Sequence, residues 1–262
     1  MRRNVLRELL NAGKPTLGFH VGIPYPGVVE VVGHSGMFDY VEYKGEGSSW
    51  DLHDLDNIGR AIDLFPHMSG MMKVEEQTRG FIAQRSLGAG IQNMLFTDCR
   101  SADDVRECIR YVRSETPTSG GIHGASGRRA YGYVLDGGSP AWVKALDDTV
   151  CCFMIEKKGA MENLEEILSV PGLSMVQFGA SDYSISVGQP GGGRGQAFKE
   201  IEKKMIRMAH DKGIPARVEL GGFESAQPYI DMGVKHFCIG QDLPLIFNWC
   251  KRNGEEMRKL LS

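Results

Sequence analysis

Two acidic residues each follow a short apolar run, at a spacing that could place them side by side. Glu156 comes directly after Val150–Ile155, and Asp182 follows Met175–Phe178 across a turn that contains Gly179. If the two runs are neighbouring parallel strands, both carboxylates lie at the same rim of the sheet. Facing carboxylates, with water and substrate oxygens as further ligands, suit Mg²⁺ or Mn²⁺. From spacing alone a structural explanation stands beside this one, in which Asp182 caps a helix and Glu156 forms a salt bridge.

These two runs belong to a series of eight short apolar segments that alternate with amphipathic stretches. Such alternation is typical of parallel strands joined by helices. The expected strands are Thr16–Val21, Phe38–Tyr43, Gly70–Val74, Ile91–Phe96, Val150–Ile155, Met175–Phe178, Ala216–Glu219 and His236–Ile239. The expected helices are Val5–Asn11, Leu52–Leu64, Val105–Val112, Ala197–Lys212, Glu224–Met232 and Leu243–Leu261.

Local signals support the helices of this series. Apolar residues in Leu52–Leu64 recur at the spacing of one helical face. Ser101 precedes Val105–Val112 and can accept hydrogen bonds from the free amides at the start of a helix. The series predicts an α/β fold, a closed (β/α)8 TIM barrel in which residues 1–262 form a single domain. A doubly wound open sheet is the alternative, and both folds place the chemistry at the C-terminal ends of the strands.

Composition limits the classes of function. The charged fraction is 24% and the formal net charge is −3, without the basic patch that a nucleic-acid-binding protein needs. No apolar run approaches the roughly 20 residues that cross a bilayer, and the N-terminus lacks the apolar stretch of a signal peptide. We therefore expect a cytoplasmic protein that binds neither nucleic acid nor membrane. The six cysteines form no CxxC pair, which favours reduced, buried thiols over a disulfide frame or a zinc site.

Two predicted loops are longer than a compact domain usually needs. They are Arg113–Pro140 and Gly179–Gly195, and both are rich in glycine. Long loops of this kind are functional or disordered. Arg128 and Arg129 in the first loop could clamp a substrate carboxylate or phosphate. Solvated arginines or a subunit contact are the alternatives.

Around the two acidic residues the chain resembles a known family. The segments that carry this resemblance are Met154–Glu156, Leu164–Ile167, Val170–Leu173 and Phe178–Asp182. They look like the metal-binding core of the HpcH/HpaI aldolases, the class II pyruvate aldolases related to 2-keto-3-deoxy-sugar-acid and 4-hydroxy-2-oxoheptanedioate aldolases. Less specific similarity covers nearly the whole chain, at Gly13–Gly18, Gly33–Asp39, Leu87–Ile91, Met232–Phe237 and Gly240–Asp242.

The resemblance implies a metal-dependent carbon–carbon lyase that acts on pyruvate or another 2-oxo acid, with an aldehyde as the second partner. Glu156 and Asp182 would bind the metal, Mg²⁺ or Mn²⁺, with Co²⁺ or Zn²⁺ as alternatives. The metal would polarise the 2-oxo group and stabilise an enolate. Backbone N–H groups near Gly179, Ala180 and Ser181 would face the substrate carboxylate.

The resemblance also implies a homo-oligomer. Members of the family often form hexamers, or trimers of dimers, in which the last helix packs on a neighbouring subunit. The apolar side chains of Leu243–Leu261 could serve that contact. Packing of this helix on its own barrel is the alternative.

The chain departs from the family at two places. Family members usually carry an Asp-x-Glu-His-Gly string after the second strand, where this chain has Lys44-Gly-Glu46-Gly47-Ser48. Gly47 therefore replaces the catalytic base histidine, and Lys44 replaces its partner aspartate, whereas Glu46 is retained. Lys73 stands where the family has an arginine. It keeps the positive charge near the oxo-acid oxygens but cannot form the bidentate fork of arginine. A Schiff base at Lys73 is a further alternative.

Loss of the histidine leaves the proton-transfer group open. The candidates are Glu46, His20, His123 and a metal-bound water, and a purely structural, hydrogen-bonded His20 is the alternative for that residue. The leading hypothesis is aldol cleavage of a hydroxy-oxo acid. The same metal site could also serve a 2-oxo-acid decarboxylase or a condensing enzyme, and a non-catalytic binding homologue is the remaining possibility.

Overall fold

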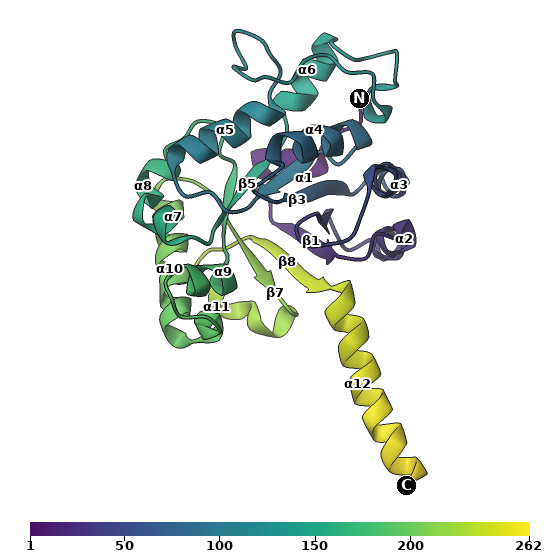
Figure 1. The fold of residues 1–262 in the computed structure, drawn as a ribbon, viewed down its shortest axis with the longest axis vertical. Helices are drawn as coiled ribbons and strands as arrows, with labels where there is room; N and C mark the ends of the chain where they lie inside the picture. Colours follow the sequence, from purple (N-terminus) through teal and green to yellow (C-terminus); the bar gives the residue numbers. More distant parts are fainter.

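A computed structural model describes all residues, 1–262. Eight parallel strands close into one barrel in the order β1 to β8, with the helices outside it (Figure 1). The strands are β1 (Thr16–Val21), β2 (Tyr40–Lys44), β3 (Ser69–Val74), β4 (Asn93–Phe96), β5 (Cys151–Ile155), β6 (Met175–Phe178), β7 (Ala216–Leu220) and β8 (His236–Gln241). Pairing of β1 with β8 completes the ring. The predicted barrel and all eight of its strands are therefore confirmed, and the open sheet is excluded.

The helices follow the strands with one exception, α1, which precedes β1. They are α1 (Val5–Asn11), α2 (Pro26–His34), α3 (Leu52–Asp63), α4 (Arg79–Ala89), α5 (Ala102–Val112), α6 (Pro140–Asp147), α7 (Lys158–Glu162), α8 (Leu164–Ile167), α9 (Ala180–Ser186), α10 (Gln196–Asp211), α11 (Gln227–Ile230) and α12 (Asp242–Leu261). The expected helix at Glu224–Met232 is shorter, because Pro228 lacks the N–H that a longer helix would need there.

The prediction of a loop at Gly179–Gly195 was wrong for its first part, because Ala180–Ser186 forms α9. This segment is short and polar, so it has no apolar periodicity to reveal it. The predicted cap of α5 is confirmed: Ser101 accepts a hydrogen bond from the Asp104 amide at 3.2 Å, and the Asp104 carboxylate accepts one from the Ser101 amide at 3.0 Å.

The interior of the barrel has an apolar end and a charged end. At the N-terminal end, Leu6 of α1 packs against interior side chains of the strands and seals the barrel. Those side chains are Tyr40, Met71, Leu95, Val150, Cys152, Met154 and Met175. Farther along the strands the buried interior residues are Glu42, Gln177 and Arg217. The interior is thus apolar at the N-terminal ends of the strands and polar towards their C-terminal ends. Active sites of this fold lie at the C-terminal ends.

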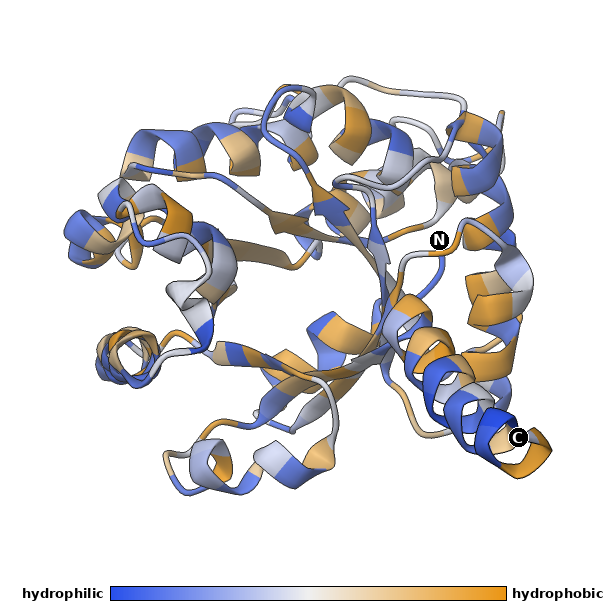
Figure 2. Cartoon of the chain, turned by 60° about the horizontal axis from the view of Figure 1, so that its bottom comes forward, coloured by the Kyte–Doolittle hydropathy of each residue, from blue (hydrophilic) through white to orange (hydrophobic).

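The last helix, α12, stands away from the barrel (Figure 1). Asp242 holds its start, because its carboxylate accepts hydrogen bonds from the amides of Gly22 at 2.9 Å and Ile23 at 2.8 Å. Beyond Asp242 none of its residues is buried. Apolar and polar residues alternate along it in Figure 2, and the exposed apolar ones are Leu243, Leu245, Ile246, Phe247, Trp249, Met257, Leu260 and Leu261. None of the helices is both long and apolar enough to span a bilayer.

The cysteines follow the prediction with one exception. Cys99, Cys108, Cys151, Cys152 and Cys238 are buried thiols. Cys250 is exposed because it lies on α12, away from the barrel, and is the correction to the sequence-based expectation.

Candidate active site

Glu156 lies at the C-terminal end of β5 and is fully buried. Its Oε1 accepts a hydrogen bond from the backbone N–H of Asp98 at 2.9 Å, whereas its Oε2 has no hydrogen-bond partner. The carboxylate lies against Gly179, where an added Cβ would come within 2.6 Å of Oε2. Because glycine has no Cβ, position 179 leaves space beside Oε2, and this buried oxygen remains free to bind a ligand.

Burial raises the pKa of Glu156 to about 7. The hydrogen bond from Asp98 and the charge of Lys73 oppose this rise, and the nearby carboxylates of Asp98 and Asp182 add to it. A raised pKa means that these surroundings disfavour the negative charge of Glu156. A cation beside Oε2 would restore the balance.

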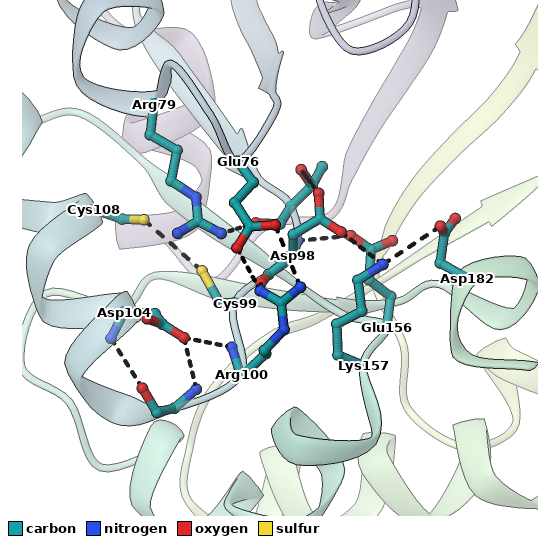
Figure 3. Close-up of polar contacts among 12 residues, drawn as sticks. Glu76, Arg79, Asp98, Cys99, Arg100, Asp104, Cys108, Glu156, Lys157 and Asp182 are labelled. Atoms are coloured by element: carbon teal, nitrogen blue, oxygen red, sulfur yellow. Dashed lines mark hydrogen bonds and ion pairs between the residues drawn. The ribbon is translucent and has the colours of Figure 1, made fainter. Parts of the chain in front are cut away.

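Asp182 lies in the first turn of α9, at the same rim as Glu156, and is half-exposed. It makes no capping hydrogen bond, and Glu156 makes no salt bridge, so the two structural explanations are not found. Figure 3 shows the Lys157 ammonium between two carboxylates. Its Nζ is 2.7 Å from Asp98 Oδ1 and 3.6 Å from Asp182 Oδ1. Three carboxylates from the ends of β4, β5 and β6 thus meet at one place.

This arrangement fits a divalent cation by the chemistry of its donors. The free Glu156 Oε2 is a buried oxygen without a partner, and Asp182 offers a second carboxylate at the same rim. Oxygen donors of this kind are the ones that Mg²⁺ and Mn²⁺ prefer. Glu156 and Asp182 would hold the ion, and Lys157 would have to release Asp182.

Lys73, at the end of β3, forms an ion pair with Glu46 at 2.5 Å. Burial lowers the pKa of Lys73, but Glu46, Glu42 and Glu156 together raise it above its ordinary value. The amine is therefore held as an ammonium. A Schiff base needs the neutral amine, so this setting favours a charge partner for an anion over a nucleophile.

His20, at the end of β1, lies between two carboxylates. Its Nδ1 is 3.4 Å from Glu219 Oε1, and its Nε2 is 3.7 Å from Glu42 Oε1. Burial raises the pKa of Glu219, but His20, Arg217 and Lys73 lower it to about 2, so Glu219 is ionised. The three residues offer one ligand atom each within 4.8 Å of one another and could hold a metal ion.

A buried network fixes the carboxylate of Glu219. Gln177 donates a hydrogen bond to Glu219 Oε2 at 3.1 Å and accepts one from Arg217 at 2.5 Å. Arg217 also donates to the Tyr40 hydroxyl at 2.7 Å and pairs with Glu42. The guanidinium, which is fully buried, has all its partners inside the barrel. It serves to position the carboxylates that flank His20.

Comparison with known proteins identifies the family. Residues 54–245 match the family described as HpcH/HpaI aldolase/citrate lyase. The chain belongs to this family. A 4-hydroxy-2-oxo-heptane-1,7-dioate aldolase from Shigella boydii is 24% identical over 244 residues, which cover 93% of this chain and 90% of that relative. The family and its aldolase-named members make the chain a carbon–carbon lyase of the aldolase/citrate lyase type.

Solved structures show the same fold. An HpcH/HpaI family protein from Burkholderia cenocepacia has a TM-score of 0.87 at 20% identity, with 98% of this chain and all of that chain (100%) covered. The citrate synthase SbnG has a TM-score of 0.83 at 20% identity, with 98% of each chain covered.

The resemblance to the family places a histidine at position 47, where this chain has glycine. Gly47 has a positive φ of 65°, and a Cβ added there would meet no atom within 4 Å. Glycine itself offers no side chain for proton transfer at this position. His20 and Glu219 lie at the rim instead.

The structure does not bring Arg128 or His123 to this site. Both lie in the connection from α5 to β5, which joins the N-terminal end of a strand and is therefore at the opposite end of the barrel. Arg128 lies 3.8 Å from Asp56 of α3, and His123 is buried against Trp142. Gly179, Ala180 and Ser181 do lie at the site, at the start of α9.

Sequence reasoning missed Asp98, Lys157 and Glu219. Each stands at or just beyond the C-terminal end of a strand, as Glu156 does. The rule that selected Glu156 would also have selected them, but many strands end in polar residues. Only the assembled barrel shows which of them point to the same place.

The pKa of Glu156 predicts how the stability of the metal-free protein depends on pH. Its ordinary value is 4.5 and its value in the fold is about 7. Between these values the native state binds more protons than the unfolded state, so the free energy of unfolding falls as pH rises. The favourable contribution of the protonated Glu156 to the free energy of unfolding is complete below pH 4.5 and is lost as pH rises through about 7. Urea unfolding of wild type and Glu156→Gln across this range tests it, because the variant should lack this slope. Parallel profiles for the two proteins would contradict the assignment.

Proposed function

We propose that this lyase cleaves a hydroxy-substituted 2-oxo acid into pyruvate, or a related 2-oxo acid, and an aldehyde, with Mg²⁺ or Mn²⁺ held by Glu156 and Asp182. The observation that carries the proposal is the buried, unpartnered Oε2 of Glu156 at the same rim as Asp182. When bound, such an ion acts as a Lewis acid on the 2-oxo group.

The groups around Glu156 and Asp182 suit the binding of an anionic substrate. The Lys73 ammonium, held by Glu46, supplies a fixed positive charge on the side towards Glu156. The first amides of α9, at Ala180 and Ser181, have no partner within the helix and lie at its positive end. We infer that they bind the substrate carboxylate, with Gly179 keeping the approach open.

We propose His20 as the group that takes the hydroxyl proton of the cleaved alcohol. Glu219 faces its Nδ1 and can hold the imidazole in one orientation, as an aspartate would in the family's usual pair. Glu46 is the weaker candidate, because its carboxylate is paired with Lys73. A water on the metal is the remaining candidate for this step.

The same residues also support a second function, decarboxylation or condensation of a 2-oxo acid. Gly47 favours decarboxylation, because loss of CO₂ leaves its electron pair as the enolate and needs no base at that position, whereas a condensation still needs a group that removes a C–H proton. A solved neighbour of this fold is named a citrate synthase, which is a condensing enzyme. Aldol cleavage and decarboxylation share the proposed metal site and differ in the need for a proton acceptor.

The decisive experiment is an activity panel with and without divalent metal. The chain would be treated with chelator, freed of it, and assayed with hydroxy-oxo acids and with oxaloacetate after addition of Mg²⁺ or Mn²⁺. We expect activity to vanish with the metal and to return with it. Full activity in a protein shown by elemental analysis to be metal-free would refute the proposal.

We further propose that α12 packs on a neighbouring subunit in a homo-oligomer, as in a hexamer or trimer of dimers. Trp249 is 68% exposed on this helix, and Leu260 is 81% exposed, an unusual setting for large apolar side chains. Static light scattering should give an oligomer at micromolar concentration, and Trp249 fluorescence should shift to the red on dilution. Trp249→Asp should weaken assembly, whereas Asn248→Asp should not, because Asn248 is exposed on a different face of the same helix. A wild-type monomer at micromolar concentration would contradict the proposal.

A further inference from the structure

A cavity of about 490 Å³ lies at the N-terminal end of the barrel, opposite the active site. Its walls come from the N-terminal segment and α1, from α4, from the α5–β5 connection and from α6. Its volume falls in the range of about 300–1,000 Å³ that is typical of small-molecule sites. Nothing in the chemistry proposed above uses it.

The long glycine-rich connection between α5 and β5 builds one wall of this cavity. Arg129 of that segment donates hydrogen bonds to the carbonyl of Ala89, at the end of α4, and pairs with Asp63 at 2.5 Å. Tyr131 follows it and is buried. These anchors hold the connection in place across the cavity, which gives a role to a segment that the active site does not need.

The cavity carries more positive than negative charge. Asp63 is shared by two guanidinium groups, since Arg2 lies 3.3 Å and Arg129 2.5 Å from its carboxylate. Arg7 has no acidic partner: it donates to the carbonyls of Asp148 and Thr149, each at 3.1 Å, and to a hydroxyl. The other two cationic side chains of the lining are balanced, because Arg3 pairs with Glu8 and Lys144 pairs with Asp148. About two positive charges are therefore left without a counter-charge.

The cavity also offers apolar wall and unused hydrogen-bonding atoms. Leu87, Ala130, Ala145 and Leu146 give it hydrocarbon surface. The hydroxyl of Tyr131, a side chain only 2% exposed, has no hydrogen-bond partner. Buried Oε1 of Gln92 is likewise without a hydrogen-bond partner. Buried polar atoms are rarely left in this state, so these point to a molecule that completes them.

We propose that this cavity is a binding site for a small organic acid, distinct from the active site. The carboxylate would pair with Arg129 and Arg2, and the hydrocarbon part would lie along Leu87 and Ala145. Charge and shape together favour this class over a neutral or cationic molecule, because the lining carries more guanidinium groups than carboxylates.

The test uses the full-length protein and simple acids as probes. Succinate, citrate and benzoate would be titrated into Glu156→Gln, which lacks the proposed metal ligand of the active site, and binding would be measured by calorimetry and by the shift of the unfolding temperature. We expect at least one of these acids to bind in this variant and to raise its unfolding temperature. Failure of all three to bind would overturn the proposal. Because the measurement needs no catalysis, its result is independent of the function proposed for the active site.

A matched pair of arginine substitutions locates the site. Arg128 and Arg129 are neighbours, and each lies within salt-bridge distance of an aspartate of α3, but only Arg129 lines the cavity. In the Glu156→Gln background, Arg129→Met should weaken acid binding about tenfold or more, whereas Arg128→Met should leave it unchanged. Should Arg129→Met impair folding, Ala145→Trp, which fills the cavity from α6, should abolish binding. If the acid binds equally well with and without Ala145→Trp in the Glu156→Gln background, it binds elsewhere and the assignment is overturned.

Discussion

Glu156→Gln is expected to remove metal-dependent activity, by at least about 10²–10³-fold, which is the usual cost of losing one preorganised electrostatic group at a reacting centre. Glutamine keeps the size of the side chain and can still accept the hydrogen bond from the Asp98 amide. It loses the negative charge that would hold the cation through the free Oε2. The fold should be little affected, because the substitution removes a charge that burial already disfavours.

Calorimetry of Mg²⁺ and Mn²⁺ binding separates this effect from a loss of structure. Asp182→Asn should weaken metal binding as Glu156→Gln does, and kcat/KM should fall in both variants. Glu162→Gln on the nearby α7 is the control, since its carboxylate is exposed and pairs only with Lys158. Unchanged metal affinity in both Glu156→Gln and Asp182→Asn would remove the basis of the proposed site.

Gly47→His is expected to raise aldol cleavage and to leave oxaloacetate decarboxylation nearly unchanged. A positioned base contributes roughly 10²–10⁴-fold to a rate, which sets the upper limit of the gain. The backbone at this position has room for a Cβ, since no atom lies within 4 Å of it. The positive φ of 65° opposes the change, and strain of this kind costs about 1–2 kcal/mol for a residue other than glycine.

Addition of Lys44→Asp should increase the gain, because an aspartate can orient the new imidazole and stabilise its charge. The measurement is kcat/KM for both reactions in wild type, the single variant and the double variant. His20→Gln in the wild-type background tests the present base and should reduce cleavage more than decarboxylation. If wild type and His20→Gln cleave the hydroxy-oxo acid equally fast, His20 is not the base, and Glu46 becomes the next residue to substitute.

The alternation of apolar runs was enough to predict the barrel and its eight strands, because each buried strand leaves a short, distinct signal. The short helices α7, α8 and α9 could not be predicted in this way. They span one or two turns, which is too little for a helical period to appear in the sequence.

The placement of Glu156 and Asp182 at one rim was predictable from the sequence, whereas the residues around them were not. Glu156 and Asp182 follow strands that are adjacent in the sequence and in space. His20 and Glu219, by contrast, are 199 residues apart and meet only because β1 and β7 both flank β8 in the closed ring. Arg128 was predicted to contact substrate because of its residue type and its long loop. The structure places it at the opposite end of the barrel from the site.

Glu42 and Arg217 pair inside the barrel with both side chains fully buried, which restricts how this sequence can evolve. Loss of either partner alone would leave an uncompensated buried charge, at a cost of about 3–5 kcal/mol, a large share of the roughly 5–15 kcal/mol that stabilises a typical domain. Joint replacement by apolar residues of similar volume is often neutral. Descendants of this chain should therefore retain both residues or exchange both together. Two positions 175 residues apart in the sequence should then covary as closely as neighbours.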